Sequence, residues 1–99
     1  MPPLYRDFQT QAEIDAQYNA VQAVPDFPRY MQRHATLSQQ LRQSLPCTLD
    51  VPYGATLAET LDIFPAARAN APVFVFIHGG YWRALSSKDC SLVATGLRR

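Results

Sequence analysis

The 99-residue sequence predicts an α/β fold, and three observations carry that prediction. Apolar residues recur at helical spacing within the first 45 residues, whereas from Cys47 onward they alternate with polar residues. Val73–Ile77 is then an uninterrupted apolar run, which two glycines and a further helical segment follow. A strand, a glycine loop and a helix in this order form half of a βαβ unit, so a mainly parallel sheet is expected.

Two helices are expected in the first 45 residues. Thr10 and Glu13 match a capping box, so one helix should begin there and continue to about Ala23. The second should occupy residues 26–45 between prolines. Its apolar stripe is formed by Tyr30, His34, Leu37, Leu41 and Leu45. A position on that stripe favours His34 as a hydrogen-bonded core residue rather than a ligand.

The alternating segments predict an antiparallel hairpin. Cys47–Val51 and residues 60–63 each place apolar side chains on one face and polar ones on the other, and Pro52-Tyr53-Gly54 supplies the turn. This pattern makes Asp62 a solvent-exposed acid. Val73–Ile77 has no polar member and should be covered on both faces, as in the interior of a parallel sheet.

Composition and charge exclude several classes of protein. The chain is 47% hydrophobic and 17% charged, which is ordinary for a globular domain. Nine basic and eight acidic residues give a net charge of +1, so neither nucleic acid nor a membrane surface is expected as a partner. The longest apolar run is too short to cross a bilayer and Met1 opens no signal segment, so a cytoplasmic location is expected.

The two cysteines indicate no metal site. Cys47 and Cys90 are far apart in the sequence, and neither His34 nor His78 lies at ligand spacing from them. Two small buried thiols in a reducing compartment are expected, with no disulfide, metal or organic cofactor.

The segment His78-Gly79-Gly80-Tyr81-Trp82 carries the chemical signal. Two glycines after a buried strand let the backbone approach a ligand and direct its N–H groups outward. Donors fixed in this way can stabilise an oxyanion, commonly by a few kcal/mol each in the transition state. A tight turn without a ligand is the alternative for Gly79 and Gly80, and simple packing under the loop is the alternative for Trp82.

The sequence resembles the N-terminal third of an α/β-hydrolase of the esterase–lipase group. Gly54, residues 61–64, Val73–Ile77 and the H-G-G-Y-W segment carry the likeness, which is nearest to the kynurenine formamidase (arylformamidase) type. The resemblance implies that residues 1–45 are a helical extension. It implies that residues 46–99 begin the hydrolase domain, with the hairpin, the buried third strand, the oxyanion loop and the first wrapped helix, truncated before the fourth strand.

The resemblance also assigns roles to the loop residues. Gly79, Gly80 and Tyr81 would supply oxyanion-hole N–H groups, and His78 would shape the loop through the hydrogen bonds of its ring. Tyr81 and Trp82 would flank the substrate. His78 is not the general base, because in this family the order along the chain is nucleophile, acid and then base.

No nucleophile is found in the 99 residues. The family's G-x-S-x-G elbow needs two glycines four positions apart, and no pair among the four glycines has that spacing. Ser86, Ser87 and Asp89 lie at an expected helix start, where capping explains them, and Ser91 lies within that helix. The resemblance therefore implies a Ser-His-Asp hydrolase of a small N-formyl arylamide or carboxylic ester whose catalytic triad lies outside this chain. The chain alone should be inactive.

A second hypothesis comes from another class of protein. The chain would be a small non-catalytic α+β module in which the glycine loop, with Arg83 and Lys88 nearby, binds an anion or a partner. Under the hydrolase hypothesis, Val73–Ile77 lacks both neighbouring strands in this chain. An apolar strand without partners pairs with other chains, so partial order or self-association is expected.

Overall fold

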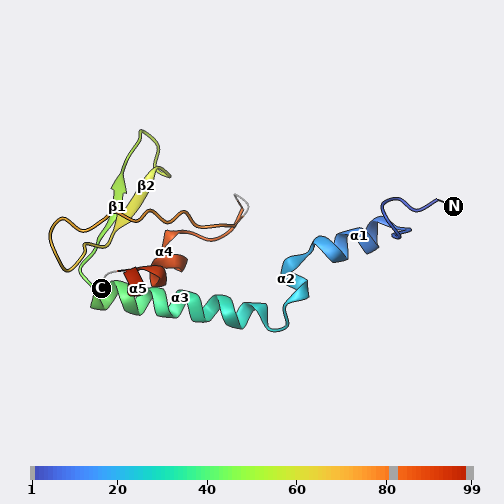
Figure 1. Cartoon of the computed structure of the whole chain (residues 1–99), viewed down its shortest axis with the longest axis horizontal. Coiled ribbons are helices and arrows are strands. Elements are labelled where there is room, and N and C mark those ends of the chain that lie inside the picture. Colours follow the sequence, from blue (N-terminus) through green and yellow to red (C-terminus); the bar gives the residue numbers. More distant parts are fainter. Residues whose placement is uncertain (1, 81–82, 98–99) are drawn as a thin grey trace. The chain divides into compact units, whose positions relative to one another are not determined.

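The computed structural model describes residues 2–80 and 83–97 and shows a mixed α/β chain with a two-stranded antiparallel sheet (Figure 1). The chain divides into two compact units, Met1–Tyr30 and Met31–Arg99. The division into a helical extension and a hydrolase portion at residue 45 stays a prediction. Among the described residues, no helix has the length and apolar character that a membrane span requires.

The first unit holds helices α1 (Gln11–Tyr18) and α2 (Ala20–Ala23). The capping box is confirmed: Thr10 Oγ1 accepts from the Glu13 N–H at 3.2 Å, and the Glu13 carboxylate accepts from the Thr10 N–H at 2.9 Å. The single helix expected here is instead divided at Asn19. The Asn19 side chain accepts from the Gln22 N–H, so this residue caps a new helix and leaves the helical conformation.

Helix α3 (Phe27–Ser44) confirms the second expected helix, but its buried face matches the expected stripe only at Leu41. Ser38 and Leu41 are buried and Met31 and Ala35 are half-buried, whereas His34 is exposed to solvent. The prediction of a core histidine is therefore wrong. The face that packs is set by polar contacts of Ser38 and Arg42, which lie one position away from the apolar stripe.

Strands β1 (Thr48–Pro52) and β2 (Thr60–Ile63) form the expected antiparallel hairpin. The register is irregular between Thr48 and Val51, and Asp50 lies there with φ at 56°. At this bulge the Asp50 N–H donates to the Asp62 carboxylate, and the Asp50 side chain contacts Lys88. The faces of β1 follow the prediction, with Val51 half-buried and Asp50 exposed, whereas those of β2 are reversed: Leu61 and Ile63 are exposed, and the Asp62 side chain is buried.

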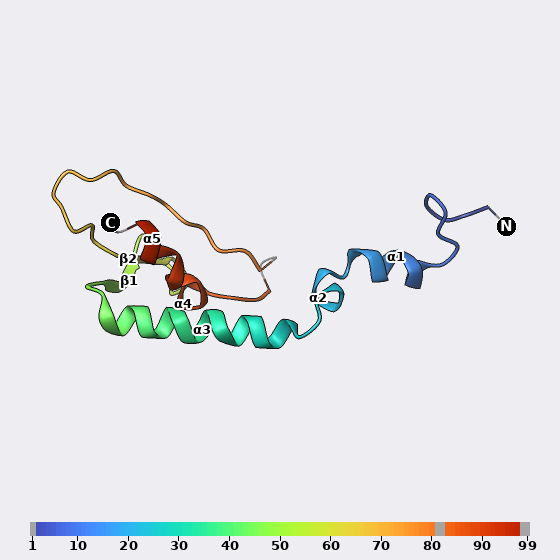
Figure 2. The ribbon, with the colours of Figure 1, turned by 60° about the horizontal axis from the view of Figure 1, so that its bottom comes forward.

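The last part of the chain is helical, as expected, but in three short pieces. They are α4 (Ser87–Cys90), the 3₁₀ helix η1 (Ser91–Val93) and α5 (Ala94–Leu97). Ser86 and Asp89 form the expected capping box at the start of α4. Figure 2 shows these pieces beside α3. Hydrogen bonds of the buried Ser38 and Ser91 join these pieces to α3.

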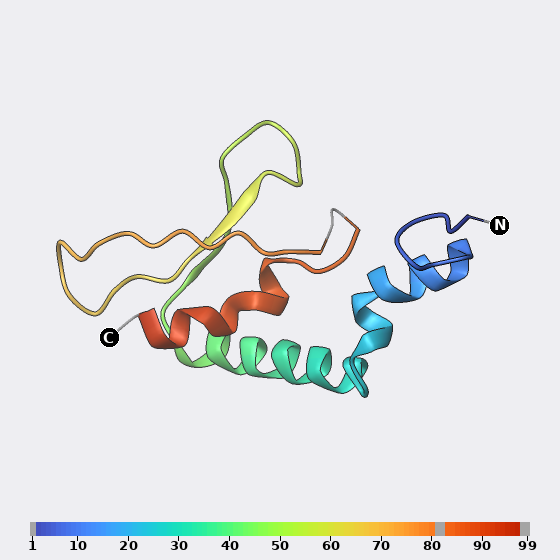
Figure 3. The same cartoon turned by 45° about the vertical axis from the view of Figure 1, so that its right-hand side comes forward.

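Val73–Ile77 does not form a strand here. It passes from the hairpin toward the glycine loop as an irregular, exposed segment (Figure 3). The expectation of a strand covered on both faces is therefore wrong for this chain. A strand is stabilised by a hydrogen-bonded neighbour, and the only ladder among the described residues joins β1 to β2.

Candidate functional site

The glycine loop is held by a contact between its own residues. His78 is exposed, and its ring nitrogen Nδ1 lies 2.7 Å from the carbonyl oxygen of Gly79. A carbonyl oxygen only accepts, so Nδ1 carries the proton in this hydrogen bond. The peptide bond between Gly79 and Gly80 is trans, so its N–H and C=O point in opposite directions. Holding the Gly79 carbonyl against the ring therefore directs the Gly80 N–H away from His78.

Gly80 occupies a position that only glycine fits. Its φ is 127°, outside the regions that residues with a Cβ normally adopt. A Cβ at this position would lie 1.8 Å from the carbonyl oxygen of Ala84. The Gly80 carbonyl accepts from the N–H groups of Arg83 and Ala84 at 3.0 and 3.1 Å, which closes a tight turn.

The backbone donors of the loop point to no protein acceptor among the described residues. Within residues 2–80 and 83–97, neither the Gly79 N–H nor the Gly80 N–H donates a hydrogen bond. A Cβ at Gly79 would meet nothing within 4 Å, so the backbone there is open to an approaching group. Tyr81 and Trp82, for which the resemblance implies a third N–H donor and the substrate contacts, lie outside the described residues.

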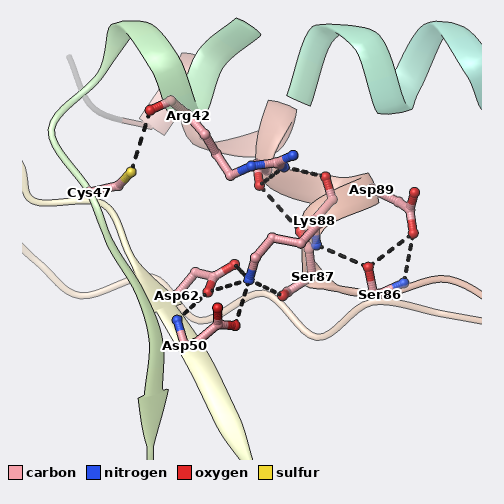
Figure 4. Close-up of polar contacts among 9 residues, drawn as sticks. Arg42, Cys47, Asp50, Asp62, Ser86, Ser87, Lys88 and Asp89 are labelled. Carbon is pink, nitrogen blue, oxygen red and sulfur yellow. Dashed lines mark hydrogen bonds and ion pairs between the residues drawn. The ribbon is translucent and has the colours of Figure 1, made fainter. Parts of the chain in front are cut away.

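A polar cluster fixes α4 against the hairpin (Figure 4). Lys88 Nζ lies 2.8 Å from both carboxylate oxygens of Asp62 and 2.9 Å from Asp50 Oδ1. Asp62 Oδ1 also accepts from the Asp50 N–H at 2.9 Å. The Asp62 side chain is 5% exposed, the Lys88 side chain 32% and the Asp50 side chain 65%. The buried Asp62 carboxylate is thus the centre of the cluster.

The electrostatics of this cluster favour its charged form. Burial by itself raises the pKa of Asp62, but hydrogen bonds from Lys88 and from the Asp50 N–H, with the charge of Lys88, hold that pKa below its ordinary value. Burial by itself lowers the pKa of Lys88, and hydrogen bonds to Asp62 and Asp50 outweigh it, so that pKa is raised. Both groups remain ionised at neutral pH.

Two side chains of α3 hold the other side of α4 and η1. The buried Ser38 hydroxyl donates to the Asp89 carbonyl and accepts from the Leu92 N–H, both at 3.0 Å. Arg42 donates to the Lys88 carbonyl and to Ser91 Oγ, the latter at 2.9 Å. These contacts join residues about 50 positions apart, so the helix that follows the loop is anchored to both α3 and the hairpin.

Sequence reasoning missed this anchoring. It placed Asp62 in solvent and read Lys88 as a cation near the glycine loop, whereas Lys88 contacts two carboxylates of the hairpin. The contact of Lys88 with the hairpin could have been predicted. Asp50 and Asp62 were expected on paired strands, and two carboxylates that lie close together require a nearby cation. The contacts of Ser38 could not be predicted, because a serine within an apolar helical pattern does not indicate which distant residues it will bind.

The remaining titratable groups suggest no second centre. Cys47 and Cys90 are free, half-buried thiols, and Cys47 Sγ contacts the Arg42 carbonyl at 3.6 Å. Burial and the nearby Asp89 charge raise the pKa of Cys90, which leaves it a protonated, weak nucleophile at neutral pH. In the part of the chain that the structure describes, no three His, Cys, Asp or Glu side chains gather as metal ligands would.

Comparison with known proteins gives partial similarity to one kind of enzyme. The chain is 31% identical over 62 residues to a kynurenine formamidase of Danio rerio, a match that covers 61% of this chain and 21% of that protein. It is 35% identical over 51 residues to the Salmo salar protein of that name, covering 50% and 17%. For the Drosophila melanogaster protein the identity is 41% over 44 residues, covering 41% and 15%.

These matches span about a fifth or less of each relative's length. No protein-family profile matches the chain, and no solved structure matches it. The comparisons therefore support a formamidase-like relationship through part of the chain.

Proposed function

We propose that this chain supplies the oxyanion-stabilising loop of a hydrolase that cleaves small N-formyl arylamides. The observation that carries the proposal is the partial similarity to kynurenine formamidases, at 31% identity over 62 residues. The H-G-G segment and its strict requirement for glycine at position 80 are consistent with such a loop. A short carboxylic ester is the second substrate class, because ester and formamide hydrolysis pass through similar tetrahedral intermediates.

In the proposed reaction, a serine outside these residues attacks the formyl carbonyl, activated by a His and an Asp that also lie outside them. The carbonyl oxygen becomes negatively charged as the tetrahedral intermediate forms. The N–H groups of Gly79, Gly80 and Tyr81 would donate to that oxygen, and Tyr81 and Trp82 would flank the aryl group. Such donors stabilise the transition state more than the substrate, so they act mainly on kcat.

His78 has a positioning role in this proposal. Its hydrogen bond to the Gly79 carbonyl fixes the peptide plane whose other end is the Gly80 N–H. The Gly80 donor then needs no reorientation when the oxyanion forms. His78 neither abstracts a proton nor attacks the substrate.

The test is a chimera in which residues 46–97 of this chain replace the corresponding stretch of the Danio rerio enzyme. The chimera should hydrolyse an N-formyl arylamide such as formanilide, and should do so faster than p-nitrophenyl acetate after correction for each background rate. The 99-residue chain alone should hydrolyse neither, since no triad lies within it.

A His78→Ala version of the chimera should lose roughly tenfold in kcat with a smaller change in KM, because the Gly80 N–H remains but is no longer held in position. Gly96→Ala, at a position with no neighbour within 4 Å, is the matched control and should keep its activity. A folded chimera without formamide hydrolysis would contradict the proposal.

A further inference from the structure

The segment Val73–Ile77 presents an apolar surface on both of its sides. The exposed fractions are 90% for Val73, 63% for Phe74, 74% for Val75, 50% for Phe76 and 86% for Ile77. Pro72 and His78 bound the segment, and no residue in it carries a charge. Such a row of large apolar side chains on an unpaired backbone is a template for pairing with another strand.

The order of the side chains makes a second copy of the same segment a suitable partner. In an antiparallel pair centred on Val75, Val73 of one copy faces Ile77 of the other, Phe74 faces Phe76, and Val75 faces Val75. β-branched residues thus meet β-branched residues and aromatic rings meet aromatic rings. Pairs of both kinds stabilise neighbouring strands. The segment is therefore complementary to itself under a two-fold axis.

We propose that two copies of this chain associate by antiparallel pairing of Val73–Ile77 about Val75. The inference does not rest on the proposed hydrolase function. A net charge of +1 gives little long-range repulsion between copies. The five residues of each copy expose on the order of several hundred Å² of surface, and pairing buries only part of that area. A stable interface buries about 800 Å² on each partner, so this one is smaller. Association should consequently depend on concentration over the micromolar range and above.

The experiment that tests the register is disulfide trapping in the 99-residue chain with Cys47→Ser and Cys90→Ser. Under the proposed pairing, two Val75→Cys residues face each other with Cβ atoms about 5 Å apart, within reach of a disulfide. Two Val73→Cys residues are offset by four positions, about 13 Å along the strands, which is out of reach. Val75→Cys should form roughly tenfold more cross-linked dimer than Val73→Cys.

A charge-pair test keeps the inference falsifiable if cysteine variants fold poorly. In the Val73→Lys/Ile77→Glu double variant, antiparallel pairing places each Lys opposite a Glu, so self-association measured by sedimentation should persist. In Val73→Lys/Ile77→Lys the same pairing opposes like charges, and association should be lost. Leu57→Lys, at a fully exposed position outside the segment, is the control and should associate as the unaltered chain does.

Paired strands can also give assemblies larger than a dimer, because their faces can stack. Such assemblies would support the pairing if cross-linking at Val75→Cys still exceeds cross-linking at Val73→Cys. Equal trapping at positions 73 and 75 would overturn it, as would a chain that stays monomeric at all concentrations. Loss of association in the Lys/Glu variant would indicate a parallel pair and would likewise overturn it. None of these measurements involves hydrolysis, so this inference can fail while the proposed function stands, and the reverse.

Discussion

Gly80 shows how one residue type determines the shape of the candidate loop. Its φ of 127° and the carbonyl oxygen of Ala84, 1.8 Å from where a Cβ would lie, each exclude a side chain. The turn that follows brings two N–H groups onto the Gly80 carbonyl. The neighbouring Gly79 has open space around it, so the two glycines serve different purposes: one permits the turn and the other leaves the backbone accessible.

Replacing Gly80 with alanine should therefore open the turn. Residues with a Cβ cost about 1–3 kcal/mol in such a conformation, before the clash is counted. We expect amide hydrogen exchange at Ala84, whose N–H donates to Gly80, to accelerate by roughly tenfold or more. Gly96→Ala should leave this exchange rate unchanged, and an unaltered rate in Gly80→Ala would show that the turn does not require glycine.

The two carboxylates that bind Lys88 should contribute unequally. Asp62 is buried and accepts from Lys88 and from the Asp50 N–H, so Asp62→Asn should lower the free energy of unfolding by about 1–3 kcal/mol. Asp50 is mostly exposed, and asparagine tolerates its positive φ, so Asp50→Asn should cost less than about 1 kcal/mol. Urea unfolding of the two variants measures the difference, and equal losses would contradict the central place of Asp62.

The same cluster predicts how stability changes with pH. The pKa of Asp62 is lowered from its ordinary 3.8, so its contribution is fully present above about pH 4 and is lost as pH falls through the folded-state pKa. The pKa of Lys88 is raised from 10.5, so its contribution is lost only as pH rises beyond that value. As the pH is lowered from 5 to 2, the urea concentration at the unfolding midpoint should fall steeply for the unaltered chain. It should fall less steeply for Asp62→Asn.

At the scale of elements, Ser38 and Arg42 of α3 hold the α4–η1 segment, and of these two side chains Ser38 is the fully buried one. Ser38 is fully buried and satisfies both the Asp89 carbonyl and the Leu92 N–H. Ser38→Ala would remove both hydrogen bonds at a buried position, and it should cost about 1–3 kcal/mol by urea unfolding. Ser44→Ala, which removes only a local bond to the Leu41 carbonyl on the same helix, should cost much less. Comparable costs would show that Ser38 does not hold the contact.

Which elements form could be predicted from the sequence, because caps and prolines act locally. Thr10 with Glu13 and Ser86 with Asp89 form capping boxes as expected, and α3 ends before Pro46. The face of β2 that packs and the polar contacts made by α3 could not be predicted. They depend on Ser38 and Lys88 reaching residues distant in the sequence, and in both cases polar contacts override the apolar pattern.

At the scale of the whole molecule, the sequence could predict the part of the candidate site that is formed by neighbouring residues of the chain. The H-G-G segment indicated a backbone donor loop, and its residues are adjacent in the chain. Val73–Ile77 has the composition of a strand, yet strand formation depends on a neighbour that no local pattern supplies, and the segment stays exposed here. The anchoring of the helix after the loop was also missed, because it involves side chains from α3 and both strands.

The most direct test of the central claim removes one backbone donor from the loop. In the chimera described above, Gly79→Pro deletes the N–H at position 79, whereas Gly79→Ala keeps it and has space for the added Cβ. Loss of an oxyanion donor lowers kcat by about 10²–10³-fold. We expect that loss in Gly79→Pro, with KM for the formyl arylamide little changed and Gly79→Ala at least about tenfold more active. Equal kcat in the proline and alanine variants would contradict the claim that this loop stabilises an oxyanion.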